Sequence, residues 1–106
     1  MSAILRQNGG MEFLVEIVIE RPLDVTDGEF ELLRAREAER AAELAATGTL
    51  ERIWRPGDGE ARWMNIGLWR GATAADVASA IDSLPMRAWM TVSIRELKPH
   101  PSDPVR

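Results

Sequence analysis

Two hydrophobic periods follow one another in the first half of the chain, and they constrain the fold more than any other feature. Residues 12–20 alternate between polar and apolar side chains, and those that point one way include Phe13, Val15, Ile17 and Ile19. This is the pattern of a half-buried strand. Residues 26–47 instead carry apolar side chains at spacings of three and four, namely Phe30, Leu33, Ala41 and Leu44. That spacing predicts an amphipathic helix, whose apolar stripe must be buried against a neighbouring element.

The later segments predict shorter elements in a definite order. The expected elements are strands at 49–55 and 61–69, a helix at 73–83 and a last strand at 89–97. The turn at residues 56–59 joins the middle strands as a hairpin. Thr26 and Glu29 form a capping-box signature at the start of the first helix, and Gly48 suits its end. This order predicts an α+β fold in which two helices cover one face of a four-stranded antiparallel sheet.

Length and composition favour one small domain. The chain has 106 residues, of which 45% are hydrophobic. We expect a flexible leader at residues 1–10, one domain at 11–98 and an extended tail at 99–106. A domain of this size leaves much of its surface exposed, so self-association is plausible.

Charge and residue usage exclude several functions. A net charge of −4 and a pI of about 5.0 give no basic footprint for nucleic acid. No apolar run is as long as a membrane span, and residues 1–10 lack the pattern of a signal peptide. The chain has no Cys and one His, His100, so we expect no metal site. The absence of Cys also fits a cytoplasmic location.

Glu37 lies where a helix in contact with a sheet normally has an apolar residue. At about 100° per residue it falls in the middle of the stripe that includes Phe30 and Leu44. A carboxylate aimed at a core must be paired, protonated or in use. The functional interpretation is a general acid or base whose pKa is tuned by partial burial. The alternative is an inward Glu neutralised by Arg34 or Arg40, each one helical turn away.

Other side chains could complete a pocket between this helix and the sheet. The amide of Asn65, in the third strand, can donate to a developing enolate oxygen, or it is satisfied by backbone at a strand edge. Arg34 could hold an anionic substrate, and Arg62 beside the hairpin turn could reach the pocket mouth. The Trp residues either fill the core or wall a ligand pocket or an oligomer interface, and they are Trp54, Trp63, Trp69 and Trp89.

Short identities that run through residues 11–103 point to a known family. They are Met11-Glu12-Phe13, Pro22 with Asp24, Glu37 with Glu39 and Ala41, Gly48-Thr49, Trp54-Arg55, Asn65, Leu84-Pro85, Met90 and Leu97-x-x-His100-Pro101-Ser102. None is specific alone, but in this order and spacing they resemble the muconolactone isomerase family. The resemblance implies a ferredoxin-like βαββαβ sandwich, in agreement with the order of elements predicted above.

The resemblance also implies a reaction and an assembly. The reaction is a double-bond shift in an unsaturated lactone, from muconolactone to 3-oxoadipate enol-lactone, without metal or cofactor, in the β-ketoadipate pathway of aromatic catabolism. Glu37 matches the family's acidic pocket residue, Asn65 its Asn in the third strand, and Arg34 a position that tends to be Lys. The family forms homo-oligomers, typically decamers built as rings of dimers, in which sheets and C-terminal tails contact neighbours.

The chain departs from the family around the expected pocket. Arg62 and Trp63 stand where the family usually has His and Tyr, and the preceding turn is about three residues longer. The segment 84–90 has also lost a Pro and changed two aromatic residues. These changes leave open an alternative substrate, such as another lactone, an enone or a natural-product intermediate, for an isomerase, cyclase or dehalogenase. A non-catalytic oligomer that binds a small molecule is the remaining alternative.

Overall fold

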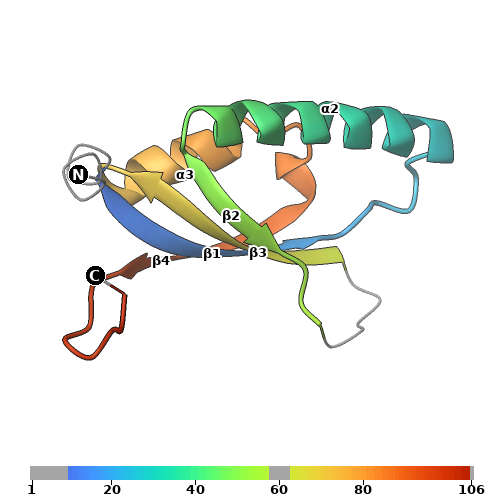
Figure 1. Ribbon diagram of the computed structural model, residues 1–106. Coiled ribbons are helices and arrows are strands. Elements are labelled where there is room, and N and C mark those ends of the chain that lie inside the picture. The colour runs from blue at the N-terminus through green and yellow to red at the C-terminus, as the bar shows by residue number, and fades with distance from the viewer. Residues whose placement is uncertain (1–9, 58–62, 106) are drawn as a thin grey trace.

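The predicted order of elements is confirmed by the structure, a computed structural model that describes residues 10–57 and 63–105. Its elements are β1 (Met11–Ile19), α2 (Asp27–Ala46), β2 (Leu50–Trp54), β3 (Trp63–Gly71), α3 (Ala74–Asp82), the 3₁₀ helix η1 (Arg87–Trp89) and β4 (Met90–Leu97). The strands pair antiparallel in the order β2-β3-β1-β4, with both helices on one face of the sheet (Figure 1). This is the ferredoxin-like α+β arrangement, and η1 is its one short element that the sequence did not predict.

The pairing register decides which side chains face the helices. Residues directly opposite each other in an antiparallel pair share a face of the sheet. In β1 and β3 the buried inner face consists of three successive pairs, Phe13 with Trp69, Val15 with Gly67 and Ile17 with Asn65. Their alternation places Asn65 on the helix-covered side, between strand residues of the core.

The core lies between this inner face and the two helices. Its buried members are Phe13, Val15, Ile17, Phe30, Leu44, Leu50, Trp69, Val77, Ile81, Leu84, Met86 and Met90. Among the described residues no charged or polar side chain is fully buried. The helix stripe predicted from Phe30 and Leu44 is therefore correct, and Glu37 is the charged residue within it.

A β-bulge in β2 decides the position of Trp54. Leu50 lies opposite Trp69, but the register shifts before Arg52, so the strand's alternation changes there. Trp54 then lies opposite Ile66, on the face away from the helices, with the Arg52 guanidinium 4.9 Å from its ring centroid. The structure thus does not bring Trp54 to a pocket between helix and sheet.

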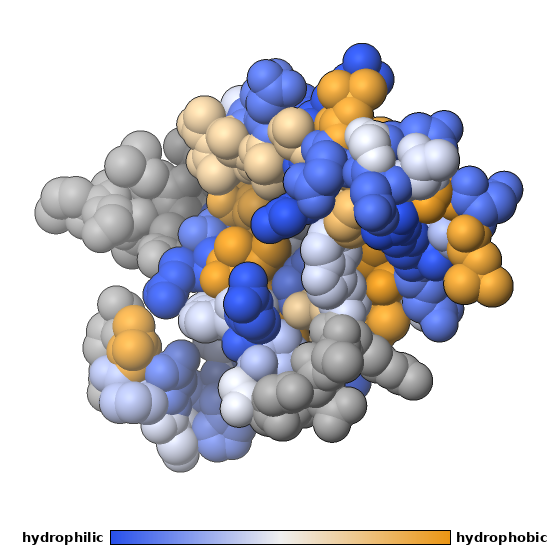
Figure 2. All heavy atoms as spheres, turned by 90° about the vertical axis from the view of Figure 1, so that its right-hand side faces the viewer, coloured by the Kyte–Doolittle hydropathy of each residue, from blue (hydrophilic) through white to orange (hydrophobic). Residues whose placement is uncertain are grey.

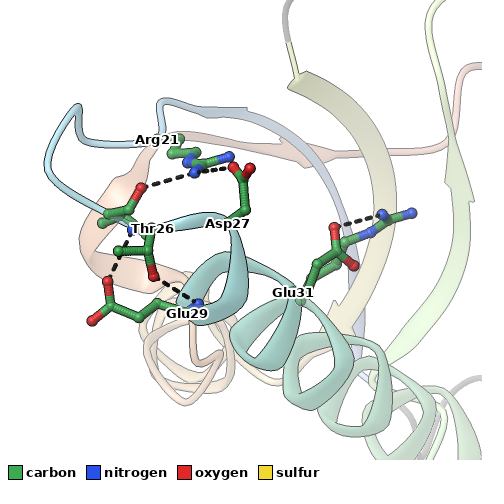
Figure 3. A network of polar contacts seen from close by, with 7 residues as sticks. Arg21, Thr26, Asp27, Glu29 and Glu31 are labelled. Atoms are coloured by element: carbon green, nitrogen blue, oxygen red, sulfur yellow. Dashed lines mark hydrogen bonds and ion pairs between the residues drawn. The ribbon is translucent and has the colours of Figure 1, made fainter.

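The start of α2 is fixed by a capping box, as predicted. Thr26 Oγ1 accepts the backbone N–H of Glu29 at 3.1 Å, and Glu29 Oε1 accepts that of Thr26 at 2.9 Å (Figure 3). Arg21 adds hydrogen bonds of 2.8 Å to the Val25 carbonyl and 2.7 Å to Asp27. The capping-box bonds occupy backbone N–H groups at the start of the helix, whereas Arg21 donates to a carbonyl and a carboxylate oxygen beside it.

Removing the Thr26 hydroxyl tests this cap. We expect Thr26→Ala to lower the free energy of unfolding by about 1 kcal/mol, because the Glu29 N–H loses its side-chain acceptor. Urea denaturation followed by circular dichroism measures the difference. Thr26→Ser keeps the hydroxyl and serves as the control. Equal midpoints for the Ala and Ser variants would contradict the assigned role.

The C-terminal tail makes a turn where the sequence predicted an extended segment. His100 Nδ1 accepts the backbone N–H of Ser102 at 2.9 Å, and the His100 carbonyl accepts that of Asp103 at 3.0 Å. The tail lies on the side of the sheet away from the helices, at the opposite end from the start of α2 (Figure 1). Apart from Gly10, the predicted leader is outside the described residues. Within the described ranges, neither helix has the length and apolarity needed to cross a membrane.

Candidate functional site

Among the described residues Glu37 makes one hydrogen bond, and its partner lies 49 residues further along the chain. Its Oε1 accepts the backbone N–H of Met86 at 2.8 Å. The carboxylate is about half-buried, and this burial raises its pKa above the ordinary value of 4.5, while the Met86 N–H has a smaller, opposite effect. A raised pKa makes the carboxylate a stronger base, as a group that accepts and returns a proton requires.

The sequence left open that Arg34 or Arg40 neutralises Glu37. In the structure both arginines form ion pairs with other carboxylates. Arg34 lies 3.6 Å from Glu31, and Arg40 lies 2.8 Å from Glu43. Across residues 10–57 and 63–105, no cation forms an ion pair with Glu37. The alternative in which Arg34 or Arg40 forms an ion pair with Glu37 is therefore wrong.

The turn after α3 explains why Met86 meets Glu37. Leu84 and Met86 are buried there, which holds the backbone against α2. Arg40 Nε donates to Ser83 Oγ at 2.9 Å and joins the same turn to α2. A backbone N–H in such a place must find an acceptor, and Glu37 supplies it. The carboxylate is thereby fixed in orientation by a group that does not neutralise it.

The position of Glu37 over the sheet follows from the contact between Phe30 and Trp63, whose ring centroids are 4.9 Å apart. From that contact α2 and β3 run in the same direction (Figure 1). Glu37 lies seven residues further along α2, or about 10 Å. Asn65 and Gly67 lie about 7 and 13 Å along β3. By this estimate Glu37 lies above the part of the inner face between Asn65 and Gly67.

Asn65 brings a free polar group to that stretch. Its side-chain Oδ1 is buried, and among the described residues it has no hydrogen-bond partner. Rotation of the amide by 180° about χ2 exchanges its oxygen and nitrogen, so either an acceptor or an N–H donor can occupy this position. A buried polar atom without a partner destabilises a fold and is a common property of binding sites.

Aromatic rings and two guanidinium groups gather at the start of α2. The Phe30 ring lies between Trp63 and Trp89, with the Trp89 ring nearly parallel at 6.0 Å. Arg21 lies 4.6 Å from the centroid of Phe30, and Arg34 lies 5.7 Å from that of Trp63. Figure 2 looks onto this end of the molecule, where hydrophobic and hydrophilic side chains share the surface. Such a cluster suits a flat ligand that carries a negative charge.

Beside the cluster, α2 borders an open hollow of about 270 Å³. It is lined by Val25, Glu29, Leu32, Leu33, Arg36 and Trp89. Neither Glu37 nor Asn65 is among the described residues that line this hollow. Trp89 thus belongs both to the aromatic cluster and to the lining of this hollow.

The structure brings most of the predicted site residues to one side of the sheet. The rise per residue along α2 and β3 places Glu37 about 3 Å beyond Asn65, and Arg34, Trp63 and Trp89 gather around the first turns of α2. Arg62 is outside the described residues, and Trp54 is on the other face. Sequence reasoning missed the Met86 N–H, because a backbone donor leaves no signal in residue types. It also missed Arg21, because no pattern of residue types places this guanidinium over Phe30. In the described ranges, no cluster of His, Cys, Asp and Glu could hold a metal ion.

Comparison with known proteins now decides the family. The family model described as muconolactone delta-isomerase matches residues 11–103. The chain belongs to the muconolactone delta-isomerase family. Among solved structures, it is similar to a crystal structure of muconolactone isomerase at 3.3 Å resolution, with a TM-score of 0.78 and 25% sequence identity. That match covers 91% of this chain and 97% of the other. A search of curated proteins gives no match.

Membership of the muconolactone delta-isomerase family confirms both the resemblance and the ferredoxin-like fold expected from the sequence. The matched range also includes the turn after α3, where Met86 contacts Glu37. Family and fold are thus established over nearly the whole described chain, while the roles of single side chains depend on the geometry above.

Proposed function

We propose that this protein is a cofactor-independent isomerase that converts muconolactone to 3-oxoadipate enol-lactone. The observation that carries the proposal is Glu37, a half-buried carboxylate without a cationic partner among the described residues, whose pKa is raised by burial. Membership of the muconolactone delta-isomerase family supports the choice of reaction. In the cell, this activity would serve the β-ketoadipate pathway of aromatic catabolism in the cytoplasm.

The proposed reaction moves one proton between two ring carbons. The Glu37 carboxylate takes the proton from the carbon that bears the ring oxygen, and that C–H electron pair moves through the double bond into the lactone carbonyl. The resulting dienolate has its negative charge on the carbonyl oxygen, which the N–H of Asn65 stabilises. The protonated Glu37 then gives the proton to the carbon next to the carbonyl. The double bond has moved, and no electrons enter or leave.

Arg34 and the aromatic cluster would orient the substrate. Muconolactone carries a carboxylate arm on the ring carbon that loses the proton, opposite the lactone carbonyl. Arg34 lies one helical turn before Glu37, and its ion pair among the described residues is an exposed contact of 3.6 Å to Glu31. Such a surface pair contributes little stability, so it can exchange for a substrate carboxylate. Trp63 and Trp89 would then contact the flat faces of the ligand.

Turnover of (4S)-muconolactone by the purified protein tests the proposal directly. The ultraviolet absorbance of the lactone changes as conjugation is lost, and we expect a rate proportional to enzyme concentration. Incubation without metal or added cofactor is part of the same assay. An inert protein, with correct circular dichroism and unchanged substrate after long incubation, would count against muconolactone as the substrate.

A second candidate is isomerisation, cyclisation or dehalogenation of a larger lactone, enone or natural-product intermediate. The specific observation in its favour is the pair of indoles on either side of Phe30. These rings offer more flat apolar surface than a five-membered lactone needs. Turnover of a larger unsaturated lactone with muconolactone inert would favour this alternative.

We also propose that the protein self-associates through the outer face of its sheet, with dimers that assemble into a decamer. The helices cover only the inner face (Figure 1). The outer face carries several half-buried apolar side chains, and those from β1 and β3 are Leu14, Val18, Met64, Ile66 and Leu68. Trp54 extends this surface from β2. Apolar side chains on a sheet face that no helix covers favour contact with another subunit.

Substitution of Leu14 by Glu tests the self-association. The new carboxylate would lie opposite Arg95, so the monomer should tolerate it, whereas an apolar subunit contact should not. We expect light scattering after size-exclusion chromatography to give a large oligomer for the natural protein and a smaller species for Leu14→Glu. Leu23→Glu, at a fully exposed position, is the matched control. A monomeric natural protein would rule out the assembly.

A further inference from the structure

Trp69 carries a buried N–H that the mechanism above does not use. The residue is 2% exposed, in the core beneath α2. Its indole Nε1 has no hydrogen-bond partner within residues 10–57 and 63–105. Asn65 Oδ1, four residues earlier on the same face of β3, shares that property. Two unpartnered polar groups on one strand are unusual, because buried donors and acceptors are normally paired.

Gly67, between them on the same face, is what allows the indole to lie where it does. A Cβ at this position would be 2.6 Å from Trp69 Nε1 and 3.1 Å from Trp69 Cδ1. Such contacts are too short for real atoms, so any side chain at position 67 would displace the ring. The indole therefore leans back along β3 toward Asn65, and its N–H edge occupies space that the missing side chain leaves free.

This places the N–H edge close to the proposed reaction centre. Glu37 is level with the stretch from Asn65 to Gly67, and the indole reaches the Gly67 end of that stretch. Arg34 lies on the other side of Glu37, toward the start of α2. A lactone with its carboxylate arm at Arg34 and its reacting carbons beneath Glu37 would therefore direct its carbonyl oxygen toward Gly67.

We propose that the indole N–H of Trp69 donates a second hydrogen bond to the substrate's carbonyl oxygen, beside the amide of Asn65, and that Gly67 makes room for it. The inference rests on the proposed lactone isomerase function and extends it to a further catalytic residue. In the dienolate the carbonyl oxygen is negatively charged and accepts two donors. Donors fixed before the reaction stabilise such an oxyanion strongly in a site without water.

A stable lactone enolate provides a test that does not require turnover. Tetronate, the anion of tetronic acid, is a five-membered lactone that is ionised at neutral pH and carries negative charge on its carbonyl oxygen. The chain has four Trp, so a ¹⁵N–¹H spectrum shows four indole signals, and the one lost in Trp69→Phe identifies Trp69. We expect tetronate to move that signal downfield in a saturable manner, whereas acetate at the same concentration leaves it in place.

Two variants then separate the hydrogen bond from packing. Trp69→Phe keeps an aromatic ring without N–H, and Gly67→Ala displaces the indole; for both we expect kcat for muconolactone to fall about 10²-fold while KM changes little. Both variants also disturb core packing and should lower the melting temperature, so kcat is compared at a temperature where circular dichroism shows each variant folded. Weaker tetronate binding by both variants would support a hydrogen bond from the Trp69 N–H to the carbonyl oxygen.

The outcomes distinguish this inference from the proposed function. If muconolactone is inert but tetronate moves the Trp69 signal, the donor is supported and only the substrate is wrong. If muconolactone is converted and both variants keep the natural kcat, Trp69 is a core residue and the inference is overturned. An unmoved Trp69 signal overturns it as well, whether tetronate binds elsewhere or not at all.

Discussion

Replacement of Glu37 by Gln is expected to lower kcat for muconolactone by about 10²–10⁴-fold, the usual contribution of a positioned general acid or base. Gln cannot accept and return the proton. Its side-chain oxygen can still accept the Met86 N–H, which Glu37 binds at 2.8 Å, so the turn after α3 should remain in place. Stopped assays of lactone absorbance with the purified variant measure the loss.

A matched control separates this chemical loss from damage to the helix. Glu39→Gln changes a carboxylate of the same helix that lies on the exposed side, and it should keep the natural rate. Circular dichroism of both variants should be unchanged. If Glu37→Gln converts muconolactone at the natural rate, then Glu37 is not the proton-transfer group, whatever its burial.

Titration of Glu37 should change the activity and the stability of the protein in opposite directions, and both changes can be measured. Burial raises the pKa of the folded carboxyl above its ordinary value of 4.5. Activity needs the ionised form, so kcat/KM should fall as pH decreases, with a midpoint above that value. Stability changes in the other direction. Between the two pKa values the folded state binds more protons than the unfolded state, so the free energy of unfolding decreases as pH rises through the folded pKa. Glu37→Gln should therefore gain stability relative to the natural protein from pH 4 to pH 7.

Replacement of Asn65 by Ala is the second change with a large expected effect. We expect kcat to fall by about 10²–10³-fold, because one of the donors to the developing oxyanion is lost. The fold should not be weakened, since the buried Oδ1 of Asn65 has no partner among the described residues to lose. A variant at least as stable as the natural protein but slow in catalysis is therefore the expected result.

Met64→Ala is the control for Asn65→Ala. Met64 precedes Asn65 in β3 but lies opposite Val18, on the outer face, so its loss removes side-chain volume without touching the site. The comparison of kcat for the two variants isolates the amide. Equal activity of Asn65→Ala and the natural protein would show that the amide only fills space between the sheet and α2.

Elements with a strong hydrophobic period could be predicted from the sequence. The alternation in residues 12–20 and the stripe of residues 26–47 became β1 and α2 with shifts of one residue at their ends. Gly48 has φ of +83°, the left-handed conformation that favours glycine after a helix. These features depend on neighbours within a few residues, so local sequence is sufficient to determine them.

Features that depend on distant contacts were beyond prediction. The sequence marked Glu37 as exceptional, but not its partner, because the Met86 N–H is 49 residues away and every residue type except Pro has such a donor. The bulge before Arg52 turned Trp54 to the outer face, which no count of alternating residues shows. The relation of Gly67 to Trp69 also needed coordinates, since a glycine in a strand has several explanations.

The bond between Met86 and Glu37 has a consequence for how this protein would lose activity on heating. The N–H of Met86 holds the Glu37 carboxylate in one orientation, so when the turn after α3 loosens, the proposed proton-transfer group is no longer held in place. Local opening of a turn requires less free energy than global unfolding. Thermal inactivation would therefore begin below the melting temperature and be reversible on cooling, because the position of one side chain depends on whether the turn after α3 is docked on α2.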